Sequence, residues 1–314
     1  MIPMFNPGRA LRSAHVQTIL GSRGRGFWVR RRATPLLDAA ERHIITSSDG
    51  VQLEAWVSLQ ADPAPAIILI HGWLGHADSS YVLSSASELF GHGFSVIRLN
   101  LRDHGETAHL NEEMFHSART AEVVDAVRQI KRMVSGPVGV AGFSLGGNFA
   151  LRVARDTGLP AVAICPAIDP PASMVSIDSG FAAYRLIFLL KWQRALKQKE
   201  TAFPHRYEFA EARNLKTVTD LTDLFVREHT DYPDTDSYLA AYTLTGEALR
   251  NTEATVIYAE DDPVIPAAGF EQLPTGIETI ASRHGGHCAF IRDIRKPTWV
   301  DDYLVRHFDA RFGG

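Results

Sequence analysis

Cysteine is scarce in this sequence, because only Cys165 and Cys288 occur among 314 residues. Two cysteines cannot build a framework of several disulfides, and their spacing matches no zinc site, so we expect two small buried side chains. The zinc motif H-E-x-x-H is missing as well. The sequence therefore predicts neither a metal site nor a bound cofactor.

Long apolar runs are also missing. The most apolar segment, residues 181–190, contains Arg185 and falls well short of the roughly 20 apolar residues that span a bilayer. The first residues lack the basic and then apolar pattern of a secretory signal. No internal repeat or low-complexity tract occurs. We therefore expect a cytoplasmic protein.

Acidic residues are absent from the start of the chain. Seven arginines precede Asp38, the first acidic residue, so residues 1–40 are predicted to form a basic N-terminal arm. We favour a solvated arm that lies over the folded body; the alternative is peripheral contact with an anionic membrane surface or an acidic partner. The formal net charge of the whole chain is −4, which argues against a nucleic-acid-binding protein.

The apolar residues that are present indicate an α/β fold. They make up 45% of the chain, and several short runs are continuous, as in strands buried on both faces of a parallel sheet. Segments with helical spacing separate some runs, and this alternation predicts a mostly parallel sheet with helices on both faces. The expected elements are a hairpin at residues 43–47 and 51–59, strands at 66–70, 94–99, 138–141, 161–165 and 254–259, and helices at 82–90, 121–134 and 298–312.

After residue 165 the alternation of strands and helices stops for a long stretch. Because a structureless loop of that length is uncommon in a compact domain, we expect a helical cap inserted between two strands. Its helices are expected at residues 181–199, 221–228 and 237–249. The predicted domains are the N-terminal arm at 1–40, an α/β core at 41–165 and 251–314, and the cap at 166–250.

A candidate nucleophile lies at Ser144, in the segment Gly142-Phe143-Ser144-Leu145-Gly146. This segment fits G-x-S-x-G, a pattern that is weak alone but strong where a strand enters it and a helix leaves it. Both conditions are met here, because the strand at 138–141 precedes it and a helical pattern at 148–156 follows. We predict a nucleophilic serine; the alternative is a glycine-rich turn without chemistry.

The predicted strand at 66–70 ends in His71-Gly72-Trp73-Leu74-Gly75. In folds with this kind of serine turn, the loop after that strand supplies a backbone N–H to the tetrahedral intermediate, and the residue after the serine supplies a second. The amides of Trp73 and Leu145 are therefore the expected oxyanion donors. We expect His71 to bond the loop backbone; a catalytic role for it is the alternative.

A serine hydroxyl needs a base that takes its proton, and the base needs an acid that orients it. The expected order along the chain is serine, acid and then histidine. Asp262, which follows the strand at 254–259, is the predicted acid, with Asp261 and Asp169 as alternatives. His287, which follows Gly285-Gly286, is the predicted base, with His284 as its competitor.

With these motifs in place, the chain resembles the α/β-hydrolase superfamily, and more narrowly the YheT-like hydrolases of bacteria and the related plant embryogenesis-associated and animal abhydrolase-domain proteins. The resemblance covers almost the whole chain and implies the α/β-hydrolase fold, with a mostly parallel sheet, helices on both faces and a helical cap insertion. The loop Asn100–Gly105 departs from it, since it matches the Arg-x-x-Gly turn of the broader superfamily. The motifs that carry the resemblance are His15-x-Gln17-Thr18, His71-Gly72-Trp73-Leu74-Gly75, Gly142 to Asn148, Asp261-Asp262-Pro263 and His284-Gly285-Gly286-His287.

The resemblance implies hydrolysis of carboxylic esters, with short, medium or lipid-like acyl groups, through an acyl-enzyme. The same triad could serve an acyltransferase or a thioesterase, and a non-catalytic ligand-binding protein on this scaffold is the alternative from another class. The expected partner is a small-molecule ester, while substrate-binding residues and oligomeric state do not follow from the sequence. Apolar cap residues either line a pocket or, as we favour, form the core of the cap; they are Phe181, Tyr184, Leu186, Phe188, Leu189 and Trp192.

Overall fold

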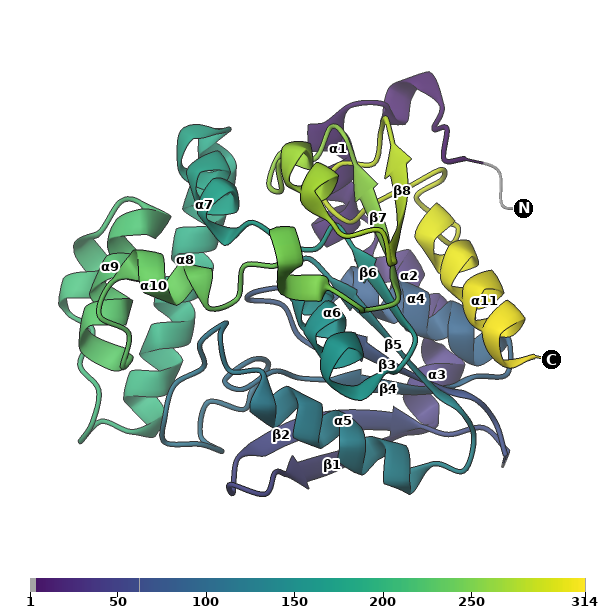
Figure 1. The fold of residues 1–314 in the computed structure, drawn as a ribbon, viewed down its shortest axis with the longest axis horizontal. Helices are drawn as coiled ribbons and strands as arrows, with labels where there is room; N and C mark the ends of the chain where they lie inside the picture. Colours follow the sequence, from purple (N-terminus) through teal and green to yellow (C-terminus); the bar gives the residue numbers. More distant parts are fainter. Residues whose placement is uncertain (1–3, 62, 314) are drawn as a thin grey trace.

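The computed structural model describes residues 4–61 and 63–313, and one mixed sheet crosses this part of the chain (Figure 1). Its strands are β1 (Ala40–Thr46), β2 (Gln52–Ser58), β3 (Ala66–Ile70), β4 (Ser95–Leu99), β5 (Val138–Phe143), β6 (Ala161–Ile164), β7 (Ala254–Ala259) and β8 (Ile277–Ser282). Their order is β1-β2-β4-β3-β5-β6-β7-β8. β2 pairs antiparallel with β1 and β4, which confirms the predicted hairpin, and all other neighbours are parallel.

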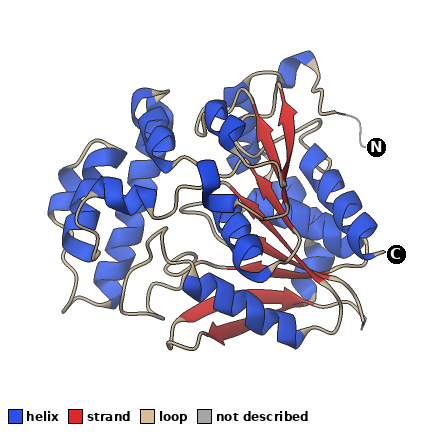
Figure 2. Cartoon of the chain, in the orientation of Figure 1, coloured by secondary structure: helices blue, strands red, loops and turns tan. Residues whose placement is uncertain are grey.

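Helices cover both faces of the sheet, as predicted (Figure 2). α4 (Ser80–Gly91) and α11 (Trp299–Phe312) bury apolar side chains on one face, and α5 (Ala121–Met133) and α6 (Leu145–Thr157) do so on the other. All residues of β3, β4, β5 and β6 are buried. Two apolar layers therefore enclose these strands, which explains why the sequences of β3, β5 and β6 are continuously apolar; β4 differs in containing the buried Ser95 and Arg98.

The N-terminal segment lies over the folded body as expected, but it is helical and partly buried. It contains α1 (Ala14–Ile19), a π-helix (Leu20–Gly24), α2 (Gly26–Arg32) and α3 (Thr34–Asp38). Val29 and Leu36 are each only 1% exposed and pack into the core, and the Arg25 side chain donates to the Ile294 carbonyl at 3.2 Å. The expectation of a solvated arm is therefore wrong for these residues, because long-range contacts anchor them.

A group of helices lies beside the sheet, where the sequence predicted a cap (Figure 1). It comprises α7 (Pro170–Ser179), α8 (Ala182–Ala202), α9 (Val218–His229) and α10 (Thr235–Ala240). The sequence did not predict α7. Asp169 caps this helix by accepting a hydrogen bond from the Ala172 amide at 3.0 Å, and a proline opens its first turn.

The single helix expected at residues 237–249 is wrong. α10 ends at Ala240, and a separate 3-10 helix spans Gly246–Leu249. Gly246 has a φ of +64°, in the left-handed region, so α-helical backbone cannot continue through it.

Within the described ranges, no single helix is long and apolar enough to cross a membrane. α7 and α8 meet the criterion only when taken together, and a bend of 112° separates them.

Candidate active site

Ser144 lies in a sharp turn between β5 and α6. Its φ of +55° is strained for a residue with a side chain. A Cβ atom at Gly142 would lie 2.0 Å from the Gly146 carbonyl oxygen, and one at Gly146 would lie 2.3 Å from the Ile70 carbonyl oxygen. Only glycine fits at either place, so the motif is required by close packing of the backbone around Ser144.

The structure brings Ser144, His287 and Asp262 together in one hydrogen-bonded chain. His287 Nε2 lies 3.0 Å from Ser144 Oγ, and His287 Nδ1 lies 2.9 Å from Asp262 Oδ2. The other oxygen of Asp262 accepts hydrogen bonds from the amides of Val264 and Ile265 at 2.8 and 3.0 Å. These two amides fix the buried carboxylate, which in turn fixes the orientation of the imidazole.

The competing residues have other partners. Asp261 accepts a hydrogen bond from the Gly286 amide at 2.9 Å and lies 3.4 Å from His284 Nδ1. Asp169 caps α7. In the part of the chain that the structure describes, none of these side chains bonds Ser144 or His287; Asp261 instead supports the loop through its hydrogen bond to the Gly286 amide.

Burial and charge act in opposite directions on the pKa of His287. Burial of the ring lowers it, whereas the adjacent Asp262 carboxylate and the Cys288 sulfur, 4.0 Å from Nε2, raise it. The net result is a pKa well above the usual value of 6.5. The site therefore stabilises the imidazolium that forms when His287 takes a proton.

Two buried histidines hold the loop that follows β3. His71 Nδ1 donates to the Gly72 carbonyl of the same loop at 2.7 Å. Its Nε2 accepts from the amide of Leu101, which lies in the loop after β4, at 3.1 Å. His104 Nε2 accepts from the Leu74 amide at 3.1 Å. Burial lowers the pKa of His71 well below 6.5 and that of His104 to about 4, so both rings are neutral and can accept these bonds. His71 therefore bonds the loop backbone, as expected.

The same loop leaves one amide free. The Gly72 amide donates to the Tyr81 hydroxyl at 3.0 Å, Leu74 to His104, and Gly75 to the Gly72 carbonyl. Among the described residues, the Trp73 amide has no hydrogen-bond acceptor. The Leu145 amide has none either, because it lies in the first turn of α6. The two amides predicted as oxyanion donors are thus available to a ligand.

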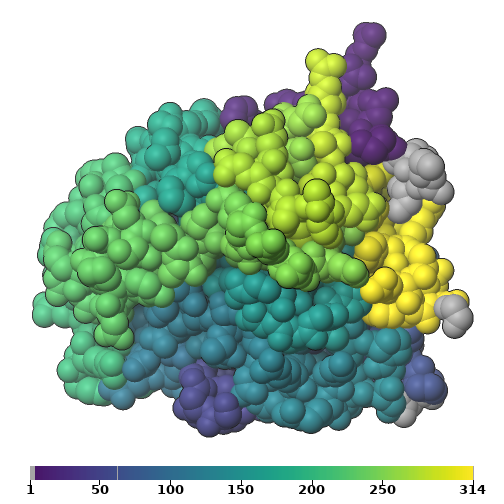
Figure 3. Space-filling model, viewed as in Figure 1, coloured from purple at the N-terminus to yellow at the C-terminus, as the bar shows by residue number. Residues whose placement is uncertain are grey.

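Sequence reasoning missed the contribution of the N-terminal motif to this site. Thr18 Oγ1 accepts a hydrogen bond from the backbone amide of His287 at 2.9 Å. The fully buried Gln17 donates to the Ile291 carbonyl at 3.0 Å and accepts from the Ile291 amide at 2.8 Å. His15 Nδ1 lies 2.9 Å from the Tyr184 hydroxyl of α8. In the space-filling view, the N-terminal segment lies beside the chain that follows β7 (Figure 3). The signal in the sequence was the motif His15-x-Gln17-Thr18, which carried the family resemblance without an assigned role.

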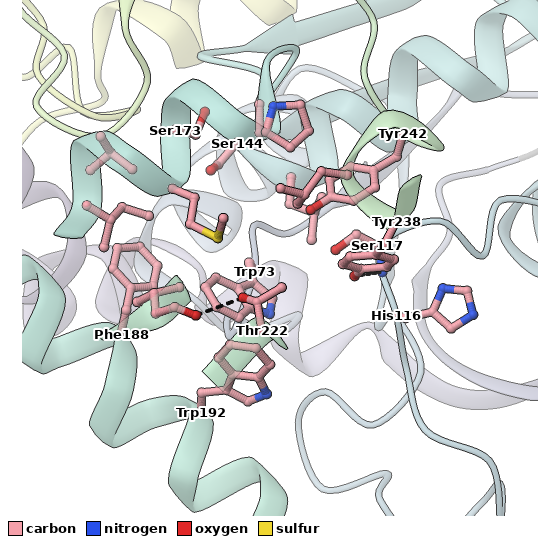
Figure 4. Close-up of a pocket in the computed structure, with 18 of the residues that line it drawn as sticks. Trp73, His116, Ser117, Ser144, Ser173, Phe188, Trp192, Thr222, Tyr238 and Tyr242 are labelled. Atoms are coloured by element: carbon pink, nitrogen blue, oxygen red, sulfur yellow. Dashed lines mark hydrogen bonds between the residues drawn. The ribbon is translucent and has the colours of Figure 1, made fainter. Parts of the chain in front are cut away.

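Two spaces meet at Ser144. The small pocket, of about 110 Å³, lies between core and cap and is lined mainly by apolar side chains (Figure 4). The wide cleft, of about 1180 Å³, extends along α8 and the loop after β3. Trp73 lines both spaces; its ring stacks on Phe188 with centroids 5.6 Å apart and contacts Trp192 edge-on at 4.9 Å.

The apolar cap residues divide between the two expected roles. Phe188 and Trp192 line both the small pocket and the wide cleft, and Tyr184 lines the wide cleft. Leu189 packs in the core of the cap, whereas Phe181 and Leu186 are exposed.

In the described ranges, no group of three or more potential ligand residues could hold a metal ion.

Residues 67–296 match the sequence model of the alpha/beta hydrolase family. The chain belongs to this family. It is 26% identical over 96% of its length to the Escherichia coli protein named "Putative esterase YheT", covering 94% of that protein. It is 22% identical to the embryogenesis-associated protein EMB8 of Picea glauca, over 94% of this chain and 70% of that protein. These relatives confirm the resemblance to YheT-like hydrolases.

Solved structures share the fold of this hydrolase at low identity. A serine hydrolase from Cycloclasticus zankles has a TM-score of 0.59 at 16% identity, with 88% of this chain and all of that one covered. An esterase from Pyrococcus furiosus has a TM-score of 0.55 at 16% identity, with 88% and 93% covered. The predicted α/β-hydrolase fold is thereby confirmed.

Proposed function

We propose that this hydrolase cleaves carboxylic esters by transferring the acyl group to Ser144. The observation that carries the proposal is the hydrogen-bonded chain from Ser144 through His287 to the buried Asp262. A serine hydroxyl is a weak nucleophile unless an oriented base takes its proton, and this arrangement supplies both the base and its orientation. The relative that is named an esterase supports the same reaction.

In the proposed first step, Ser144 Oγ attacks the ester carbonyl carbon while His287 Nε2 takes the hydroxyl proton. The carbonyl oxygen becomes an oxyanion that the free amides of Trp73 and Leu145 bind. His287 then gives its proton to the alcohol oxygen as the bond from that oxygen to the carbonyl carbon breaks, which leaves an acyl-enzyme. A water molecule, deprotonated by His287, releases the acid and restores Ser144.

The wide cleft favours hydrolysis over transfer to another acceptor, because it lets water reach His287 from solvent. An acyltransferase would exclude water from this side of the acyl-enzyme. A non-catalytic binding protein would not need a free oxyanion loop beside an oriented serine.

A nitrophenyl butyrate assay and fluorophosphonate labelling test the proposal together. We expect the wild-type protein to hydrolyse the ester and to be labelled at Ser144. Ser144→Ala removes the nucleophile while keeping the fold, so turnover falls by about 10⁴-fold or more and labelling is lost. Ester turnover that survives Ser144→Ala would overturn the assignment, and failure of both assays in a folded protein would favour the ligand-binding alternative.

A further inference from the structure

The position of His287 relative to the two spaces at Ser144 determines where each half of an ester lies. His287 lines the wide cleft but not the small pocket. In the proposed reaction, its Nε2 must reach the oxygen of the leaving alcohol in order to protonate it. The alcohol portion therefore lies in the wide cleft, and the acyl portion enters the small pocket beside Leu145.

The size of the small pocket limits the acyl portion. Its volume is about 110 Å³, which is smaller than a cavity of roughly 150 Å³ that binds benzene. Aromatic side chains form much of its wall, including Phe188, Trp192 and Phe225. A short apolar acyl chain of about four carbons fits this space, and a long fatty chain does not.

The charges of the wide cleft are unbalanced once its ion pairs are taken into account. Arg42 pairs with Glu54 at 2.5 Å, and Lys199 pairs with Asp103 at 2.9 Å. The cleft residue Asp78 lies between Arg30 and Arg98. Among the described residues that line the cleft, three cations have no carboxylate partner, namely Arg23, Lys191 and Arg194, whereas only one carboxylate, that of Glu106, has no cation partner.

Lys191 brings this positive charge close to the reacting atoms. Its Nζ lies 3.5 Å from the carbonyl of Leu74, in the loop that carries the free Trp73 amide. Burial and the neighbouring charge of Arg23 lower the pKa of Lys191. An anion held between the two side chains would relieve this repulsion, so the position favours a negatively charged ligand.

We propose that the substrate is a short-chain ester whose alcohol portion carries an anionic group, bound in the wide cleft by Lys191 and Arg23. The inference rests on the proposed function and adds the substrate class to it. A carboxylate, a sulfonate or a phosphate would serve equally, because each accepts charge-assisted hydrogen bonds from ammonium and guanidinium groups. The short acyl chain makes the substrate a soluble ester and not a long-chain lipid.

Three butyrate esters that differ in the charge of the alcohol test the proposal. The alcohols are 3-hydroxybenzoate (anionic), 3-hydroxybenzamide (neutral) and 3-hydroxyphenyltrimethylammonium (cationic), and each kcat/KM is divided by the rate of hydroxide hydrolysis. We expect the anionic ester to exceed the neutral one by roughly three- to tenfold at low salt, since exposed charge pairs contribute modestly. The preference shrinks as salt is added.

Lys191→Glu is the decisive variant and Lys197→Glu its matched control, because Lys197 lies on the same helix, is exposed and does not line the cleft. We expect Lys191→Glu to abolish or invert the preference, and Lys197→Glu to keep it. Equal effects of both variants, or no anionic preference in the wild type, would overturn the inference about the substrate. Hydrolysis of the neutral ester in the same experiment would still support the proposed function. A decanoate hydrolysed as fast as the butyrate would overturn the short-chain part, and no turnover of any ester would count against both proposals.

Discussion

Thr18 takes no part in the proposed chemistry, but its hydrogen bond to the loop that carries His287 predicts that it affects the reaction rate. Thr18 Oγ1 accepts from the His287 amide at 2.9 Å and donates to the Ala14 carbonyl at 2.8 Å. Thr18→Val keeps the shape of the side chain but removes both bonds. The half-buried His287 amide then loses its partner, directly beside the imidazole that must stay aligned with Ser144.

The size of the effect follows from the cost of that unpaired amide. A buried donor left without an acceptor costs about 1–3 kcal/mol. If this energy is relieved by displacement of the His287 backbone, the barrier to acyl transfer rises by a similar amount, which lowers kcat by roughly 5- to 150-fold. We expect the loss mainly in kcat, because the change acts on the position of His287; Thr18 lines the wide cleft but not the small pocket that takes the acyl portion.

Steady-state kinetics with a short-chain ester, and the rate of fluorophosphonate labelling, measure this effect. Thr18→Ser is the matched control, since it keeps the hydroxyl and deletes only a methyl group. We expect Thr18→Ser to restore most of kcat and of the labelling rate. Loss of thermal stability in Thr18→Val without any loss of kcat, or equal damage by both variants, would show that Thr18 supports the fold and does not position His287.

Two further predictions concern buried charges. The proposed reaction requires neutral His287, so kcat/KM rises with pH through a midpoint above 6.5. Asp262→Asn removes the larger of the two influences that raise the pKa of His287 and leaves burial opposed only by Cys288, which shifts that midpoint to lower pH and lowers kcat by up to about 10⁴-fold, as a pH–rate profile would reveal. An unchanged midpoint would contradict this account. The Lys199 ammonium, 1% exposed, bonds Asp103 and three backbone carbonyls between residues 108 and 113, so Lys199→Met should lower the free energy of unfolding by about 3–5 kcal/mol in urea titrations. Adding Asp103→Asn should recover part of the loss, and a single variant as stable as the wild type would refute the reasoning.

Local patterns predicted the parts of the fold whose stability depends on burial in the sheet. The apolar runs at residues 66–70 and 254–259 coincide with β3 and β7, because a strand covered on both faces must be continuously apolar. β8 was not named, since several of its side chains are exposed or half-buried at the sheet edge and give no such run. The hairpin followed from its turn residues.

Elements held by distant contacts could not be predicted in the same way. α1 has only six residues, too short to be stable alone, and its Gln17 is anchored by Ile291 near the other end of the chain. The split at Gly246 depends on a single left-handed residue within an otherwise helical pattern.

Residue types and their order along the chain predicted the candidate site, but they did not establish which aspartate bonds which histidine. The local sequence favoured Asp262, which directly precedes Pro263, and His287, which follows a glycine pair, yet Asp261 and His284 lie in the same two loops. Only the geometry separates them, because Asp262 lies 2.9 Å from His287 whereas Asp261 bonds the Gly286 amide. The two spaces around Ser144 depend on how the cap packs, which no local pattern specifies.

The hydrogen bonds between Gln17 and Ile291 join residues that are 274 positions apart, and this affects the order in which the protein becomes functional during synthesis. The turn around Ser144 can form on the ribosome once β5 and α6 have been made. The backbone amide of His287 can bond Thr18 of α1 only after residues 283–291 have been made. A nascent chain that has passed residue 144 therefore carries a serine without its base until residue 287 has been made.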